Sequence, residues 1–235
     1  MTVLLLIRHG TTAASEKGVL AGWTPGVHLT ERGSQQAEQL VDRLRGVPVA
    51  AIYSSPLERC RESAAPLASD RGLVVRVRRD LGEVRYGSWT GRRIRQVMRT
   101  KLWKVIQGAP SRARFPEGES LLEVQHRAVA ELERIVAAHR GPAIAVVSHA
   151  DVIRLAVSHF SGMHTDLFQR LVIEPASISV VALGEGLPRI LRVNDTGDLS
   201  TLLARAAPQH ARRGSSRRSR PGASGRKTAG PKVGG

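Results

Sequence analysis

Short apolar runs alternate with longer amphipathic segments along most of the chain. The short runs are rich in Val, Ile, Leu and Ala, which predicts buried strands. These predicted strands are Val3–Arg8, Ala50–Ser54, Val74–Val77, Ala143–Ser148, Ser177–Leu183 and Ile190–Asn194. The longer segments carry apolar residues at helical spacing, which predicts helices. These predicted helices are Glu31–Leu44, Leu57–Asp70, Arg92–Ile106, Ser120–His139 and Asp151–Phe160.

This alternation is typical of an α/β fold. We expect a mostly parallel sheet with helices on both faces, which is a three-layer α/β/α sandwich. Thr30 is a predicted N-cap, and Ser120 with Glu123 forms a predicted capping box. The last two strands leave no room for a helix between them, and Gly184–Gly186 suits a hairpin turn. The sheet is therefore expected to be mixed.

The length and the cysteine count limit the class of protein. A chain of 235 residues is long enough to bury a hydrophobic core. Its apolar runs all fall short of the ~18–20 residues that span a bilayer. The first run, Val3–Ile7, has no basic segment before it and is too short for a signal peptide. Cys60 is the only cysteine, which excludes an internal disulfide and a four-cysteine zinc site. We expect a cytoplasmic protein without a membrane segment.

The formal net charge of +16 is unevenly distributed. Residues 211–235 hold eight basic residues and no acidic residue, among Gly, Ser, Ala and Pro. Such a composition cannot offset the entropy of ordering, so we predict one domain over residues 1–207 and a disordered basic tail over 208–235. The tail either binds polyanions weakly, with strong salt dependence, or is an inert solubilising extension. It has no aromatic residue that would stack on bases.

A second basic concentration lies between Glu83 and Glu117. This segment contains nine basic residues and no acidic one. We hypothesise that it steers polyanionic substrates, or substrates with a second phosphate, toward a neighbouring site. The alternative is a solvated helix face enriched in arginine by codon usage.

Two predicted strands end in a histidine. His9 follows the first strand, where it is preceded by Arg8, and His149 follows the strand that ends at Ser148. A third strand leads into a helix with Arg59 in its first turn. In α/β sheets, ligands bind beyond the carboxyl ends of the strands, next to helix N-termini. If these ends are neighbours, two imidazoles and two guanidiniums form a cationic pocket that suits a phosphoryl group.

At these positions the sequence resembles the histidine phosphatase superfamily, also called phosphoglycerate mutase-like, over nearly all of residues 1–200. The resemblance rests on six motifs in the family's order, which are Arg8-His9-Gly10 with Thr12, Leu29–Ala37, Ser54–Leu57 with Arg59, Leu81–Glu83 with Tyr86–Gly91, Pro116–Ser120 and Val147–His149. A phosphatase is favoured over a primer-dependent mutase, because the mutases carry a longer insertion than the 27 residues between Gly91 and Glu119.

The resemblance implies a role for each matching residue. His9 would be the nucleophile that becomes phosphorylated. Arg8, Arg59 and His149 would hold the phosphoryl oxygens. Glu83 would be the proton donor, with Glu119 or Asp151 as alternatives that share the proton transfer. The substrate-binding positions implied are Arg8, Thr12, Ser15, Gly22, Arg59, Glu83, His149 and Ala150.

The resemblance implies no cofactor and no metal, because arginine and imidazole supply the electrostatic stabilisation. The expected activity is hydrolysis of a small phosphorylated metabolite through phosphohistidine. Alternatives are mutase-type phosphoryl transfer and a polyanion- or nucleic-acid-associated binding protein on a phosphatase fold.

Thr11, Ser15 and Ala150 depart from residues common in the family, which affects the finer contacts to phosphate and leaving group. Trp89 is expected either to wall the pocket or to pack in the core. The oligomeric state is open, with a homodimer as one option.

Overall fold

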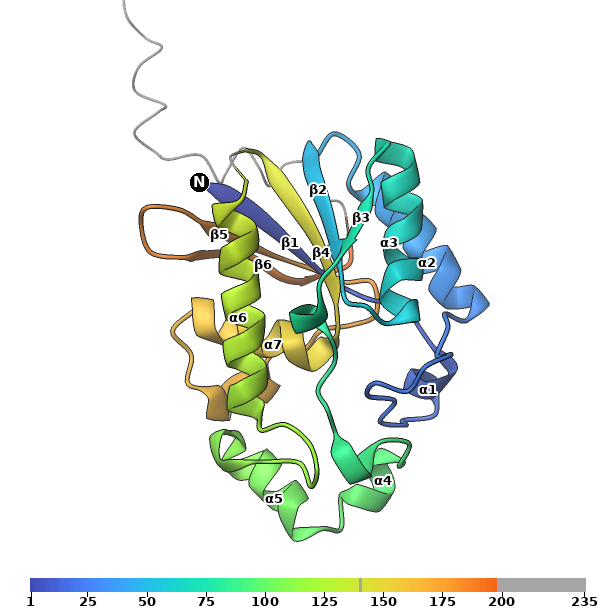
Figure 1. Ribbon diagram of the computed structural model, residues 1–235, viewed down its shortest axis with the longest axis vertical. Coiled ribbons are helices and arrows are strands. Elements are labelled where there is room, and N and C mark those ends of the chain that lie inside the picture. The colour runs from blue at the N-terminus through green and yellow to red at the C-terminus, as the bar shows by residue number, and fades with distance from the viewer. Residues whose placement is uncertain (140, 198–235) are drawn as a thin grey trace, which may run out of the picture.

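A six-stranded sheet lies at the centre of the computed structural model, which describes residues 1–139 and 141–197 (Figure 1). The strand order is β3-β2-β4-β1-β5-β6. Its strands are β1 (Thr2–Arg8), β2 (Val49–Ser54), β3 (Val75–Val77), β4 (Ala143–Ser148), β5 (Ile178–Leu183) and β6 (Arg189–Asp195). The pairs among β1, β2, β3 and β4 are parallel, whereas β5 is antiparallel to both β1 and β6. The prediction of a mixed α/β sheet that ends in a hairpin is confirmed.

The longer helices begin where the sequence predicts caps. The Thr30 side chain accepts a hydrogen bond from the Gly33 backbone amide, and Ser120 and Glu123 form the expected capping box. The helices are α1 (Ala13–Glu16), α2 (Glu31–Arg43), α3 (Glu58–Arg71), α4 (Ile94–Val97), α5 (Lys101–Gly108), α6 (Leu121–Ala137) and α7 (Ala150–Phe160). Among the described residues, no helix is both long and apolar enough to cross a bilayer.

Helices pack on both faces of the sheet because side chains alternate along each strand. In β1, Val3, Leu5 and Ile7 join the apolar cluster that contains residues of α2 and α3. Leu4 and Leu6 join the opposite cluster, which contains residues of α6 and α7. Figure 1 shows α2 and α3 on one side of the strands and α6 and α7 on the other. A strand buried on both faces reads as a continuous apolar run, which is how β1 appears in the sequence.

The predicted single helix over Arg92–Ile106 is wrong. The chain forms two helices there, because Thr100 caps α5 by accepting a hydrogen bond from the Trp103 backbone amide at 3.2 Å. Such a cap competes with helical continuation at the same residue. The short helix α1, capped by Thr12, was not predicted. The predicted tail over 208–235 and the end of the predicted domain lie outside the described residues.

Residues 84–121, which contain α4 and α5, cover the carboxyl ends of the strands. We call this segment the lid. A third apolar cluster connects the lid to α6 and α7, through residues that include Trp89, Phe115 and Val124. In Figure 1, α4 and α5 lie apart from the sheet, beyond the edge where β1 and β4 end. The lid therefore packs against α6 and α7 rather than directly on the sheet.

The register of the parallel strands brings three of their ends together. Arg8 at the end of β1 pairs with Ser148 at the end of β4, and Ser54 at the end of β2 pairs with Val147. The residues that follow these ends, including His9 and His149, consequently lie at one edge of the sheet, as the sequence predicts.

The loop after His9 packs very closely against the first turn of α2. A methyl group on Gly33 would lie 2.1 Å from the Thr11 carbonyl oxygen, and one on Gly10 would lie 2.5 Å from the Gly33 carbonyl oxygen. Both neighbours are backbone atoms, which cannot move aside as a flexible side chain does. Glycine at these two positions therefore allows the His9 loop to reach its place against α2.

Gly33→Ala is expected to lower the free energy of unfolding by about 2 kcal/mol, as overpacking of a tight contact does. Helix propensity acts in the opposite direction, because alanine is favoured over glycine by up to ~1 kcal/mol within a helix. Urea denaturation of Gly33→Ala and of Ser34→Ala, an exposed position in the same turn, measures the difference. A Gly33→Ala midpoint at or above that of the unmodified protein would contradict the close packing.

Candidate active site

A cavity of about 220 Å³ opens at the sheet edge where β1 and β4 end. Of the sequence-predicted site residues, those that line it are Arg8, His9, Thr12, Ser15, Arg59, Glu83 and Ala150. His149 is fully buried behind this wall, and the Gly22 carbonyl oxygen contacts Arg59. Among the alternatives for proton transfer, Asp151 lines the cavity and Glu119 does not. The tertiary structure therefore gathers the predicted set around one cavity.

His9 is held as a neutral imidazole with one free nitrogen. Its Nδ1 lies 2.7 Å from the Gly10 carbonyl oxygen, which accepts a hydrogen bond from Nδ1–H. Burial, together with the charges of Arg59 and Arg8, lowers the pKa of His9 to about 3. The lone pair is consequently on Nε2 at neutral pH, and this nitrogen is available as a nucleophile.

The guanidinium groups of Arg8 and Arg59 lie beside His9, and each keeps a donor nitrogen without a hydrogen-bond partner among the described residues. Arg8 Nη1 donates to the Ile173 carbonyl oxygen at 2.6 Å, and Arg59 Nη2 donates to the Gly22 carbonyl oxygen at 2.9 Å. Arg8 Nε and Arg59 Nη1 are buried and have no hydrogen-bond partner among the described residues. Buried donors without acceptors are costly, and guanidinium donors suit the oxygens of a phosphoryl group.

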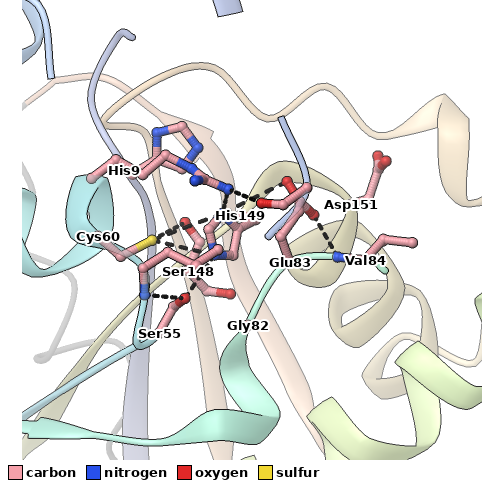
Figure 2. A network of polar contacts seen from close by, with 12 residues as sticks. His9, Ser55, Cys60, Gly82, Glu83, Val84, Ser148, His149 and Asp151 are labelled. Carbon is pink, nitrogen blue, oxygen red and sulfur yellow. Dashed lines mark hydrogen bonds and ion pairs between the residues drawn. The ribbon is translucent and has the colours of Figure 1, made fainter. Parts of the chain in front are cut away.

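His149 contacts both Ser55 and Arg59. Its Nε2 lies 2.8 Å from Ser55 Oγ, and both residues are labelled in Figure 2. Its Nδ1 lies 3.4 Å from Arg59 Nη2. Because the guanidinium can only donate, Nδ1 accepts from Arg59 and Nε2–H donates to Ser55. Burial, with the neighbouring charge of Arg59, holds the pKa of His149 well below its usual range. The ring is therefore neutral, and its centroid lies 5.3 Å from that of His9.

Cys60 packs against the same imidazole, with its Sγ 3.4 Å from His149 Nε2. Burial raises the pKa of this thiol to about 12, so it remains protonated at neutral pH. The thiol is fully buried, which is typical of an unreactive packing residue.

Glu83 carries a carboxyl group that titrates near neutrality. Burial, together with the negative charge of Asp151, raises its pKa to about 7 against the opposing effects of Arg59 and Arg8. Its Oε1 accepts a hydrogen bond from the Val84 backbone amide, and its Oε2 lies 3.6 Å from His149 Nδ1. A carboxyl group with this pKa can both donate and accept a proton at pH 7.

Arg127 in α6 fixes the backbone that carries Glu83. It donates hydrogen bonds to the carbonyl oxygens of Asp80, Gly82 and Glu83, at 2.7, 2.8 and 3.0 Å. Its Nε and Nη2 bind the Glu119 carboxylate at 2.8 and 3.0 Å, which uses the donors of the guanidinium in full. Glu119 is thus a partner of Arg127 rather than a cavity residue.

Trp23 fixes the same backbone from the other side. Its Nε1 donates to the Glu83 carbonyl oxygen at 2.6 Å. The Arg85 guanidinium lies 4.1 Å from the centroid of the Trp23 ring, within cation–π range. A side chain on Gly82 would collide with the Trp23 ring at 2.3 Å. Glu83 is consequently held between an arginine and a tryptophan that lie far from it in sequence.

Sequence reasoning missed several residues of the site. Tyr86 and Arg154 line the cavity, and both bind the Asp151 carboxylate, at 3.3 and 2.9 Å. The spacing of Asp151 and Arg154, three residues apart at the start of a helix, is the one local signal that could have identified this pair. The contributions of Arg127 and Trp23 depend on contacts distant in sequence, which leave no local pattern.

Comparison with known proteins agrees with this geometry. The protein is 29% identical to phosphoserine phosphatase 1 of Hydrogenobacter thermophilus, over 88% of this chain and 98% of the relative. It is 30% identical to a 2,3-bisphosphoglycerate-dependent phosphoglycerate mutase of Thermoplasma acidophilum, over 77% of this chain and 87% of the relative. The crystal structure of a putative alpha-ribazole-5'-P phosphatase from Escherichia coli superimposes with a TM-score of 0.76 at 27% identity, over 84% of this chain and 98% of that one.

The profile of one family matches residues 4–196, which include every site residue described above. The chain therefore belongs to the histidine phosphatase superfamily, branch 1.

Proposed function

We propose that the protein hydrolyses phosphomonoesters of small metabolites through a phosphohistidine intermediate. The observation that carries this proposal is the neutral, buried imidazole of His9 beside Arg8 and Arg59. Within residues 1–139 and 141–197, His9 Nε2 and one donor nitrogen of each arginine have no hydrogen-bond partner. A nucleophile next to guanidinium donors is the arrangement that phosphoryl transfer requires, since catalysis there is mostly positioning and charge stabilisation. Relatives named phosphoserine phosphatase and alpha-ribazole phosphatase support this reaction class.

In the first step, His9 Nε2 attacks phosphorus and the bond from phosphorus to the ester oxygen breaks. The Glu83 carboxyl group gives its proton to the departing oxygen, which leaves an alcohol, a phosphohistidine and a Glu83 carboxylate. In the second step, Glu83 takes a proton from water as the water oxygen attacks phosphorus. The bond between nitrogen and phosphorus breaks, phosphate departs, and His9 and the Glu83 carboxyl group are regenerated.

The other predicted residues act on the phosphoryl group directly or through Arg59. Arg8 and Arg59 hold its oxygens. The resemblance predicts that His149 contacts these oxygens directly, but its ring is fully buried and does not line the cavity, so we propose that it orients Arg59 through Nδ1. The Gly22 carbonyl oxygen orients the same guanidinium. The remaining predicted positions shape the wall, with the Thr12 and Ser15 hydroxyls engaged in the cap of α1 and Ala150 in the first turn of α7. The positive end of the α7 dipole adds to the attraction for an anion.

Mutase-type transfer is the nearest alternative, and one relative carries that name. A mutase must return the phosphoryl group to a second hydroxyl while it excludes water. The short lid segment between Gly91 and Glu119 favours hydrolysis. Binding of polyanions by the basic tail, the homodimer option and the cytoplasmic location stay predictions.

His9→Ala is expected to lower kcat for a chromogenic aryl phosphate by at least ~10³-fold, as removal of a nucleophile does. His159→Ala, at an exposed histidine outside the cavity, is the matched control and is expected to leave kcat unchanged. Hydrolysis by the unmodified protein is expected to persist in EDTA and to fall with vanadate. Activity that survives His9→Ala would refute the mechanism.

The activity of the unmodified protein on an alkyl phosphate is expected to fall as pH rises through about 7, because Glu83 loses the proton that the alkoxide requires. Asp151→Asn removes a charge that raises the pKa of Glu83, so the fall is expected at lower pH. Glu83→Gln is expected to abolish the fall together with most of the activity. The measurement is the pH profile of kcat/KM for all three proteins on the same substrate. Because the substrate titrates identically in each case, differences between the profiles report the enzyme. An unshifted profile in Asp151→Asn would exclude the coupling.

The basic residues of the lid are exposed around α4 and α5. They include Arg92, Arg93 and Arg95, for which no ion pair is found within residues 1–139 and 141–197. We propose that their field attracts anionic substrates toward His9, because unpaired charge at a site mouth raises association rates.

Replacement of Arg92, Arg93 and Arg95 by Gln is expected to lower kcat/KM about 3- to 10-fold at low ionic strength and to weaken its salt dependence. The control variant carries the same change of charge at exposed residues outside the lid. These are Arg32 in α2, Arg61 in α3 and Arg45 in the loop after α2. Equal kcat/KM and equal salt slopes in the two triple variants would remove the steering proposal.

A further inference from the structure

A second cavity, of about 320 Å³, adjoins the cavity at His9. The two cavities share lining residues, namely Leu20, Tyr86, Ile94, Asp151 and Arg154. The second cavity therefore extends from the phosphoryl site into the lid, and a substrate with its phosphate at His9 can place its alcohol portion there.

The walls of this second cavity are mostly apolar, and five of the thirteen lining residues are aromatic. Trp89, Phe115 and Phe168 are almost fully buried, and Trp103 is half-buried at the rim. Phe115 packs edge-on against Trp89, with ring centroids 5.5 Å apart. Trp89 thus packs in the lid core and walls a cavity at the same time. Rings fixed by their neighbours form a rigid apolar surface, which favours a flat unsaturated guest over a small polar one.

The charges that line this cavity neutralise one another. Asp151 and Arg154 are the charged residues of its lining, and they are bound to each other at 2.9 Å. A second negative charge on the alcohol portion would lie near the Asp151 carboxylate. The buried Arg154 Nε has no hydrogen-bond partner among the described residues, so it can donate to a neutral acceptor on the alcohol portion. The amides of Gln107 and Gln169 add polarity without charge. The lining consequently suits an uncharged group.

We propose that this cavity is the leaving-group subsite and that it selects phosphomonoesters of uncharged alcohols that carry an aromatic or heteroaromatic ring. The proposal rests on the proposed function, since it assigns the alcohol side of the same reaction. It excludes amino-acid and carboxylate-bearing alcohols as preferred substrates. Trp103 is the specificity-determining residue that is easiest to change, because it sits at the rim.

The test compares two phosphate esters whose alcohols have similar leaving ability, so that a difference in kcat/KM reports recognition of the alcohol and not its chemical reactivity. We expect kcat/KM for 2-(1-naphthyl)ethyl phosphate to exceed that for propyl phosphate by about 10- to 100-fold.

Trp103→Ala is expected to reduce this ratio about 10-fold, equivalent to about 1.4 kcal/mol. Val105→Ala, on the same helix at a half-exposed position that does not line the cavity, is the matched control and is expected to keep the ratio. Gln107→Glu places a charge in the cavity from an exposed position and is expected to reduce the ratio without disturbing the fold.

Binding of the corresponding phosphonates, which cannot be hydrolysed, tests the subsite independently of catalysis. We expect the naphthylethyl phosphonate to bind at least 10-fold more tightly than propyl phosphonate, and Trp103→Ala to reduce that difference. If both phosphates are hydrolysed equally well, or if phosphoserine is preferred, the subsite proposal fails and the proposed function stands. If neither phosphate is hydrolysed but the phosphonates still differ, the proposed function fails, the assignment as a leaving-group subsite fails with it, and the cavity is only a binding site for aromatic groups.

Discussion

The site depends on two guanidinium groups that are buried at one edge of the sheet. Burial lowers the pKa of both His9 and His149, and the positive charges of Arg59 and Arg8 beside them lower it further, so both imidazoles stay neutral. A protonated histidine has no lone pair with which to attack phosphorus. The same charges attract the phosphoryl group, so one arrangement binds the substrate and keeps the nucleophile in its reactive form.

Glu83 shows the opposite balance in the same small volume. Two arginines nearby favour its carboxylate, yet burial and Asp151 outweigh them and raise its pKa to about 7. The environment therefore keeps the imidazole of His9 neutral and lets the Glu83 carboxyl group hold a proton at the same pH. This balance requires an exact place for the carboxyl group, and Arg127 and Trp23 provide it by binding the backbone at Glu83.

The sheet edge forms the phosphoryl site, and the lid forms the leaving-group side. The phosphoryl site is built on strand ends and the first turns of α3 and α7, which the two large apolar clusters hold rigid. The leaving-group side is built from the lid, which has a separate cluster and packs against α6 and α7. Such a division lets the lid change its specificity without disturbing the chemistry at His9. The net charge of +16 says little about this chemistry, because only a few charges lie at the site.

The sequence by itself determined the alternation of strands and helices, the mixed sheet and most of the residues around His9. It could do so because strand burial, helix caps and residues at strand ends leave local patterns. The break of the lid helix at Thr100 was not predicted, since a weak local cap there competes with helical periodicity and packing decides between them. Only the tertiary structure decided that Arg127 and Trp23 hold Glu83, that Asp151 joins Tyr86 and Arg154, and that aromatic rings of the lid enclose a second cavity. These features depend on contacts between segments far apart in the chain, whose mutual distance and burial no local pattern encodes.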